Sequence, residues 1–223
     1  MATATLTLTR KRKRRPPEPD YKFGIESTGI LMSPEEFDNA DPDDFDRLWD
    51  YELINGVLVV SPIPLEQEAD PNEELGYFLR RYQKDHPEGK TLDKTLQERY
   101  VKCGRNRRKA DRLVWAGLGR LPRKSETPTI VVEFVSRRKR DRQLDYETKR
   151  KEYAKIKVLE YWIIDRFQKH MTVHVLEGSK YRTTTITAKQ TFRTKLLPGF
   201  ELPLARLFEL ADRWDKQAEE NDA

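Results

Sequence analysis

Two acidic residues stand where the surrounding sequence predicts buried apolar side chains. Glu133 lies in the middle of IVVEFVS, residues 130–136, whose β-branched and aromatic residues are typical of a strand covered on both faces. A carboxylate buried there without a partner would be strongly destabilising or would give up its charge. We therefore expect a compensating cation next to Glu133.

The second acidic residue, Asp111, begins another strand-like run in KADRLVWAG, residues 109–117. Two carboxylates on adjacent strands can hold one hard divalent cation. Mg²⁺ takes oxygen ligands and usually keeps several waters, so one or two protein carboxylates suffice. Asp111 and Glu133 are thus candidate ligands for Mg²⁺, with Mn²⁺ as the expected substitute.

A lysine interrupts the apolar stripe of the helix predicted after the Glu133 strand. The 3-4-3 spacing of the stripe places its residues on one face of that helix. The stripe consists of Tyr146, Lys149, Tyr153 and Ile156. Lys149 occupies a place where leucine would be expected, so it is predicted to point toward the sheet. Glu52, in a predicted hairpin strand, is a fourth polar residue in an apolar setting.

Each of these residues also has a structural interpretation. Glu133 and Lys149 could form a simple ion pair, or Lys149 could extend its amine to water along apolar surface. Asp111 could pair with Arg108 or Arg112. His170 and His174 are four residues apart, but HMTVHV reads as a strand, which disfavours metal binding by this pair.

The elements that would position these residues alternate between strands and helices. Asn55-Gly56 predicts a hairpin, and Ser33 followed by Pro34 predicts a helix start. A helix is expected over 66–86, strands over 92–102 and 109–115, a hairpin over 171–186, and a last helix begun by Pro203. The helix between IVVEFVS and EYWIID predicts a βαβ unit with parallel strands. The chain is expected to form one α/β domain over residues 21–218.

Charge is unevenly distributed along the 223 residues. The net charge is +5, and residues 1–20 alone carry six consecutive basic side chains, Arg10 to Arg15, so we expect a disordered basic arm there. Further basic clusters at 102–112 and 137–142 suggest a polyanionic partner. The single cysteine, Cys103, favours a reducing compartment. With no apolar run near membrane-spanning length and no secretory signal, a cytoplasmic protein is expected.

Several of these stretches together resemble a known group of proteins. The matching segments are YELINGVLVVSP, KADRLVWAG, TIVVEFVS, DYETKRKEYAKIKVLEYWIID and LPGFELPLARLF, which cover most of residues 30–210. Their order is similar to that of the Uma-type family of restriction endonuclease-like proteins, within the PD-(D/E)XK nuclease superfamily. The resemblance implies a restriction endonuclease-like α/β core. Its central mixed sheet would be flanked by helices, with an N-terminal hairpin and a C-terminal helix.

The resemblance also implies a Mg²⁺-dependent endonuclease that hydrolyses phosphodiester bonds in DNA. Asp111 and Glu133 would hold the metal, Lys149 would be the catalytic lysine, and Glu52 would be an accessory acid. The motif's proline is Ala110 here, and Val135 stands where a lysine often follows the glutamate. Asp145 matches another recurrent position. A homodimer is expected on the same resemblance.

Next to such a site, the basic run after the Glu133 strand could contact the phosphate backbone. Its candidate nucleic-acid-binding residues are Arg137, Arg138, Lys139 and Arg140. Two other functions remain open at this point. One is a nucleic-acid-binding module of the same fold with little or no cleavage activity, and the other is an interaction protein whose acidic residues form an ion-pair network.

Overall fold

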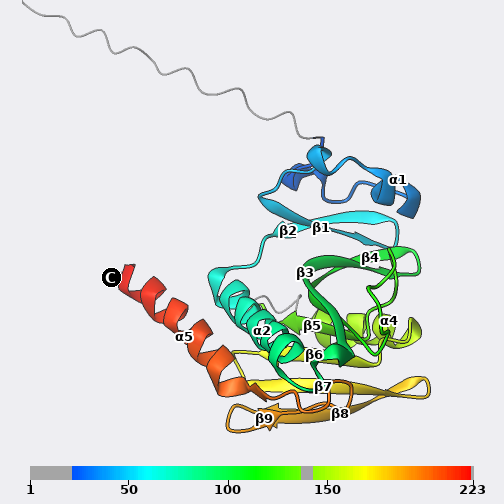
Figure 1. The fold of residues 1–223 in the computed structure, drawn as a ribbon. Coiled ribbons are helices and arrows are strands. Elements are labelled where there is room, and N and C mark those ends of the chain that lie inside the picture. Colours follow the sequence, from blue (N-terminus) through cyan, green and yellow to red (C-terminus); the bar gives the residue numbers. More distant parts are fainter. Residues whose placement is uncertain (1–21, 137–142, 222–223) are drawn as a thin grey trace, which may run out of the picture.

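The computed structural model describes residues 22–136 and 143–221 (Figure 1). The predicted arm over residues 1–20 and the candidate DNA-binding residues Arg137–Arg140 therefore lie outside the described residues. The main strands are β1 (Trp49–Ile54), β2 (Val57–Pro62), β3 (Leu92–Cys103), β4 (Asn106–Ala116), β5 (Ile130–Phe134), β6 (Glu160–Asp165), β7 (His170–Glu177) and β8 (Lys180–Thr187). Two short strands, β9 (Thr191–Phe192) and β10 (Leu202–Pro203), pair separately.

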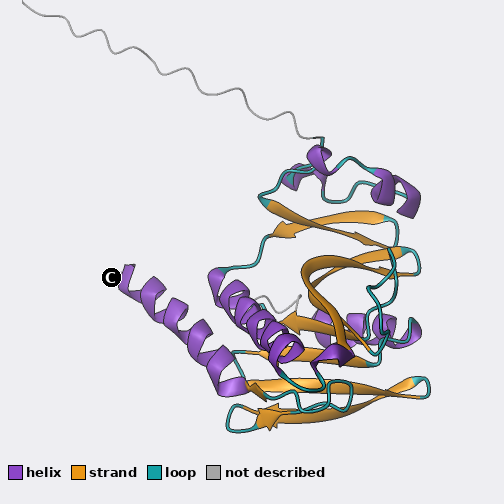
Figure 2. Ribbon diagram, viewed as in Figure 1, coloured by secondary structure: helices purple, strands orange, loops and turns teal. Residues whose placement is uncertain are grey.

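Helices cover both faces of this sheet. They are α1 (Pro34–Asn39), α2 (Glu66–Asp85), the π-helix η4 (Leu144–Lys149), α4 (Arg150–Lys155) and α5 (Leu204–Asn221). Single 3₁₀ turns lie at η1 (Ile25–Ser27), η2 (Pro42–Asp44) and η3 (Gly89–Thr91). Figure 2 shows α2 and α5 on one side of the strands and the short η4–α4 segment on the other.

The sheet is mixed and has eight strands. Its order is β2-β1-β4-β5-β6-β7-β8, with β3 also paired to β4. β5 and β6 run parallel, with Val132 opposite Trp162, and η4–α4 forms the connection between them. The neighbouring pairs are antiparallel. The predicted fold class and βαβ unit are confirmed.

Alternation along β5 divides the core into two layers. Ile130, Val132 and Phe134 pack toward α2 and α5, while Val131 and Val135 pack toward α4. All five residues of β5 are buried, as the sequence predicts for a strand covered on both faces. Glu133 shares the α4 side with Val131 and Val135, so its carboxylate enters the layer between the sheet and α4.

Local signals in the sequence account for several elements. Asn55 and Gly56 have φ values of 53° and 79°, as the turn of a two-residue hairpin requires. Ser33 accepts a hydrogen bond from the Glu36 amide, and Glu36 bonds back to the Ser33 amide, which caps α1 as predicted. The helix expected over 66–86 is α2. Within 22–136 and 143–221, no helix has the length and apolar character needed to cross a membrane.

The basic cluster at 102–112 does not form the surface patch that the sequence suggested. Arg107, Arg108 and Arg112 are buried because β4 begins at Asn106, three residues earlier than predicted, and carries them into the interior. Arg112 donates to the side chain and the backbone carbonyl of Asn72 on α2. These cations compensate internal polar groups, so they do not form a surface for a polyanion.

Candidate active site

Two strands share one edge of β4 and leave a gap between them. β1 pairs with β4 at Leu53 and Arg107, and β5 pairs with residues 112–114 of β4. The opposite edge of β4 is occupied by β3. At the shared edge, residues 108–111 therefore have no strand partner among the described strands.

Carboxylates fill this gap. The Lys109 amide donates to Glu52 Oε1 at 2.9 Å, and the Phe134 amide donates to Asp111 Oδ2 at 2.5 Å. Each carboxylate thus accepts a backbone hydrogen bond that a neighbouring strand would otherwise accept. Asp111 does not pair with Arg108 or Arg112, which were its alternative partners. The opening between β1 and β5 is consequently lined with acidic groups.

The regular alternation of side chains along β3 and β4 is interrupted next to this gap. Glu98 on β3 has φ of 49°, an uncommon conformation for a residue with a side chain. Ala110 and Leu113, three residues apart on β4, both pack in the α4-side core, although strict alternation would place them on opposite faces. Asp111 lies inside this irregular step. Local backbone strain of this kind, about 1–3 kcal/mol, is typically found at functional sites.

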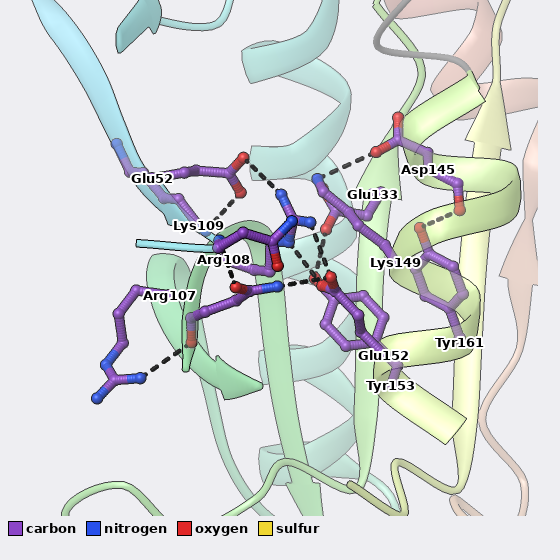
Figure 3. A network of polar contacts seen from close by, with 12 residues as sticks. Glu52, Arg107, Arg108, Lys109, Glu133, Asp145, Lys149, Glu152, Tyr153 and Tyr161 are labelled. Carbon is purple, nitrogen blue, oxygen red and sulfur yellow. Dashed lines mark hydrogen bonds and ion pairs between the residues drawn. The ribbon is translucent and has the colours of Figure 1, made fainter. Parts of the chain in front are cut away.

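The compensating cation for Glu133 is Lys149. Lys149 Nζ lies 3.0 Å from Glu133 Oε2 and 3.0 Å from Asp145 Oδ1 (Figure 3). Tyr153 donates its hydroxyl to Glu133 Oε1 at 2.9 Å. Glu133, Asp145 and Lys149 are only 3%, 5% and 6% exposed, so the charges interact in a poorly hydrated environment.

The helix presents this lysine through an unusual first turn. Leu144–Lys149 is a π-helix, a rare form that often marks functional sites. The fully buried residues of the segment are Asp145, Lys149 and Tyr153, while Tyr146 and Ile156 are only partly buried. The predicted stripe was therefore right for Lys149 and Tyr153 but missed the inward direction of Asp145. Tyr161 also contributes, by donating its hydroxyl to the Asp145 carbonyl.

A second ion-pair group connects Glu52 with the same helix. Arg108 is completely buried, and its guanidinium binds Glu152 on α4 through two hydrogen bonds of 2.6 and 2.9 Å. It also lies 3.4 Å from Glu52 Oε2. Asn106 donates to Glu152 and accepts from the Asn55 amide, which links this group to the hairpin. Figure 3 shows Arg108 between Glu52 and Glu152.

The electrostatic surroundings perturb the central groups strongly. Burial, with the Glu133 charge second, raises the pKa of Asp111 well above its usual value. Burial raises the pKa of Glu133 to about 8, although the Lys149 charge opposes this. Burial alone would lower the pKa of Lys149, but the charges of Asp145, Glu133, Glu52 and Asp111 raise it well above normal. The three predicted acidic site residues, Glu52, Asp111 and Glu133, therefore all lie within electrostatic range of Lys149.

Glu133→Gln is expected to reduce the pH dependence of stability in metal-free buffer. The pKa of Glu133 rises from 4.5 to about 8 on folding, so the folded state retains a proton that the unfolded state releases. This contribution is complete below the unfolded pKa and is lost as pH rises through the folded pKa. Urea titrations at about pH 5, 7 and 9 give the free energy of unfolding of wild type and variant, and the difference between the two proteins measures this contribution. If the free energies of unfolding of wild type and variant changed with pH in parallel, the raised pKa of Glu133 would be wrong.

This arrangement can accept a divalent cation. Burial raises the pKa values of both Asp111 and Glu133, with neighbouring negative charges adding to the rise, and a bound cation would stabilise the charged form of each carboxylate. No cluster of three or more His, Cys, Asp or Glu residues forms a ready metal cage in the described part of the chain. A metal would therefore complete its coordination with water or substrate oxygens, as Mg²⁺ commonly does.

The weaker sequence candidates lie elsewhere in ordinary structural roles. His170 and His174 are on β7, in the strand that the sequence predicted, and His174 Nδ1 is 2.8 Å from Thr183 Oγ1. Cys103 is buried, and burial raises its thiol pKa to about 12, which disfavours a reactive thiolate. Sequence reasoning missed the roles of Arg108, Glu152 and Glu98 in surrounding the site. Their partners are distant in the chain, and no local pattern indicated them.

Comparisons with known proteins agree with this fold. The family model Uma2, described as "Putative restriction endonuclease", matches residues 34–205. Among solved structures, the chain is similar to a crystal structure described as a putative nuclease belonging to DUF820 from Anabaena variabilis. The TM-score is 0.63 at 13% sequence identity, over 81% of this chain and 99% of that chain. At this identity the likeness shows the fold alone. No curated protein matches the chain.

Proposed function

This chain belongs to the Uma2 family of restriction endonuclease-like proteins, and from that premise we propose that it is a metal-dependent endonuclease acting on DNA. The observation that carries the proposal is the pair Asp111 and Glu133. They lie at a gap in the sheet, with raised pKa values and Lys149 beside them. Two carboxyl groups whose charged forms are disfavoured by burial are suited to hold a cation, because the cation would stabilise those charges.

Asp111 and Glu133 would hold Mg²⁺, or Mn²⁺ in its place. When bound, such an ion lowers the pKa of a coordinated water and polarises a phosphoryl oxygen. Hydrolysis forms one P–O bond from water and breaks one P–O ester bond, and the departing oxygen takes up a proton. The negative charge that develops on the phosphoryl oxygens requires fixed positive charge nearby.

Lys149 supplies that fixed charge in the proposed site. Its ammonium is held between Asp145 and Glu133, and its raised pKa keeps it protonated at neutral pH. Tyr153 orients the Glu133 carboxylate from the other side. Glu52 accepts the Lys109 amide at the rim of the gap and balances Arg108. It acts as an accessory acid that fixes the position of β1 against β4.

A second candidate function rests on a specific contact. Lys149 Nζ lies 3.0 Å from Glu133 Oε2, which is the arrangement expected of a structural ion pair. A nucleic-acid-binding module of the same fold, with little or no cleavage activity, would retain this pair. Metal binding distinguishes the two candidates, because the endonuclease requires it and the binding module does not.

Calorimetric titration with Mg²⁺ and Mn²⁺ tests the proposal directly. Wild type is expected to bind near millimolar metal or more tightly, and Glu133→Ala is expected to bind far more weakly because one of two protein ligands is lost. Metal-dependent cleavage of a DNA duplex should follow the same order. Absence of heat in both proteins, with no cleavage by wild type, would favour the binding module.

A further inference from the structure

A basic hollow of about 560 Å³ lies between α4 and the β7–β8 turn. Five of its eight lining residues are cationic and none is acidic. The cations are Arg150, Lys151, Lys155, Lys157 and Lys180. They come from the helix, from the segment that follows it and from the start of β8, so the fold brings together charges that are distant in sequence.

The helix that carries the candidate lysine thus has two different faces. Lys149, Glu152 and Tyr153 point into the site, where they contact Glu133 and Arg108. Arg150, Lys151 and Lys155 line the hollow on the other side of the same helix. The hollow is therefore separate from the acidic gap, although both depend on α4 for their position.

The cations of the hollow have no acidic partner within salt-bridge distance among the described residues. Elsewhere on the same hairpin, Arg182 pairs with Glu177, and Lys169 before β7 pairs with Asp212. Lys157 is held across the hollow, because its Nζ donates to the Gly178 carbonyl at 3.1 Å. Concentrated positive charge without acidic partners attracts a polyanion.

Two ordinary explanations account for only part of the hollow. Lysines near a helix C-terminus interact favourably with the helix dipole, which applies to Lys155. That effect gives no reason for Lys180, which lies on β8. A membrane surface is disfavoured because the lining residues include no exposed large apolar side chain that could enter a bilayer. Phosphate groups of a nucleic acid fit both the concave shape and the charge.

We propose that the basic hollow binds backbone phosphates of a nucleic-acid substrate and holds it without taking part in bond cleavage. The identity of the polyanion rests on the proposed function. Contacts of this kind contribute affinity without base preference. Each neutralised phosphate adds about 0.9 to the slope of log affinity against log salt for duplex DNA.

The test is a triple variant with Lys151→Gln, Lys155→Gln and Lys180→Gln. All three side chains are exposed, so the fold should be retained. Binding of a fluorescent DNA duplex is measured by anisotropy in metal-free buffer over a range of salt. The salt slope is expected to fall by up to about 2.7, and the affinity at low salt by at least about tenfold.

A matched control variant carries Lys84→Gln, Lys90→Gln and Lys216→Gln, three exposed lysines outside the hollow with the same change in net charge. Equal loss of slope in both triples would overturn the inference, because charge alone would then explain binding. Anionic vesicles replace DNA in a parallel titration. If the hollow variant loses vesicle binding but keeps DNA binding, the inference is likewise wrong.

Cleavage is measured separately, so the two proposals can fail independently. If wild type cleaves DNA and the hollow variant binds it as tightly as wild type does, the hollow inference is wrong and the endonuclease proposal stands. If wild type does not cleave but the hollow variant alone loses affinity, the hollow binds nucleic acid and the endonuclease proposal is wrong.

Discussion

Lys149→Met is expected to lower metal-dependent DNA cleavage by about 10²- to 10³-fold, the loss typical of removing one electrostatic stabiliser of a transition state. Methionine keeps the apolar stem that packs beneath the ammonium. Metal should still bind, since the Asp111 and Glu133 carboxylates remain and a competing cation is gone. Single-turnover cleavage at saturating metal measures the chemical step.

The stability of Lys149→Met gives a second measurement. In metal-free buffer at about pH 9, where Glu133 is ionised, the variant leaves this buried carboxylate without its ion-pair partner, which is expected to destabilise the fold by about 3–5 kcal/mol. In the endonuclease, Mg²⁺ should restore much of this loss, because the cation replaces the missing positive charge and binds only the folded state. In a purely structural ion pair, Mg²⁺ should have no effect.

The control for this experiment is Lys84→Met on the exposed face of α2. It makes the same chemical change without a buried partner, so stability, metal binding and cleavage should all stay near wild type. If Lys149→Met cleaved DNA at the wild-type rate, the lysine would have no role in the reaction. If it lost stability that Mg²⁺ did not restore, the ion-pair interpretation would be favoured.

Much of the framework could be predicted because its signals are local. The Asn55-Gly56 turn, the Ser33 cap and the periodicity of α2 each depend on a few neighbouring residues. The parallel pairing of β5 and β6 also followed from sequence, since two apolar strands joined by a helix are usually parallel neighbours. Such patterns identify helices and strands well. They carry little information about where two strands leave a gap along the edge of a third, as β1 and β5 do along β4.

The details of the site depend on this gap and on its surroundings. Glu98 has a positive φ that its residue type does not predict, and the β4 side chains depart from strict alternation between Ala110 and Leu113. The basic run before Asp111 reads as a solvated surface cluster, yet Arg108 is completely buried against Glu152, 44 residues away. The π-helix adds a wider turn that brings Asp145 inward. These features follow from tertiary pairing, so only the structure shows them.

The buried charges have a common physical consequence. The carboxylates around Lys149 raise its pKa, and burial raises the pKa values of Asp111 and Glu133 at the same time. Such a cluster is less stable than an apolar core of the same volume would be. Proteins commonly retain destabilising groups of this kind where function requires them. Removing one carboxylate should therefore move stability and activity in opposite directions.

Asp111→Asn is expected to show this opposition most clearly. Asparagine keeps an oxygen that can accept the Phe134 amide, so the gap between β4 and β5 should retain its geometry. It removes a half-buried carboxyl whose pKa is raised by burial and by the Glu133 charge, and the metal-free free energy of unfolding near pH 8 should rise by about 1–3 kcal/mol. Cleavage should fall by at least about 10³-fold, because one of two metal-binding carboxylates is gone.

Asp93→Asn is the matched control for this change. Asp93 on β3 also accepts backbone amides, those of Leu118 and Arg120, but its surroundings contain no second buried carboxylate that could share a metal. The control should leave cleavage unchanged and should not stabilise the protein as pH rises. If Asp111→Asn behaved like this control in both measurements, Asp111 would serve only to join two strands. A gain in stability together with a loss of cleavage requires that its charge is retained for the reaction.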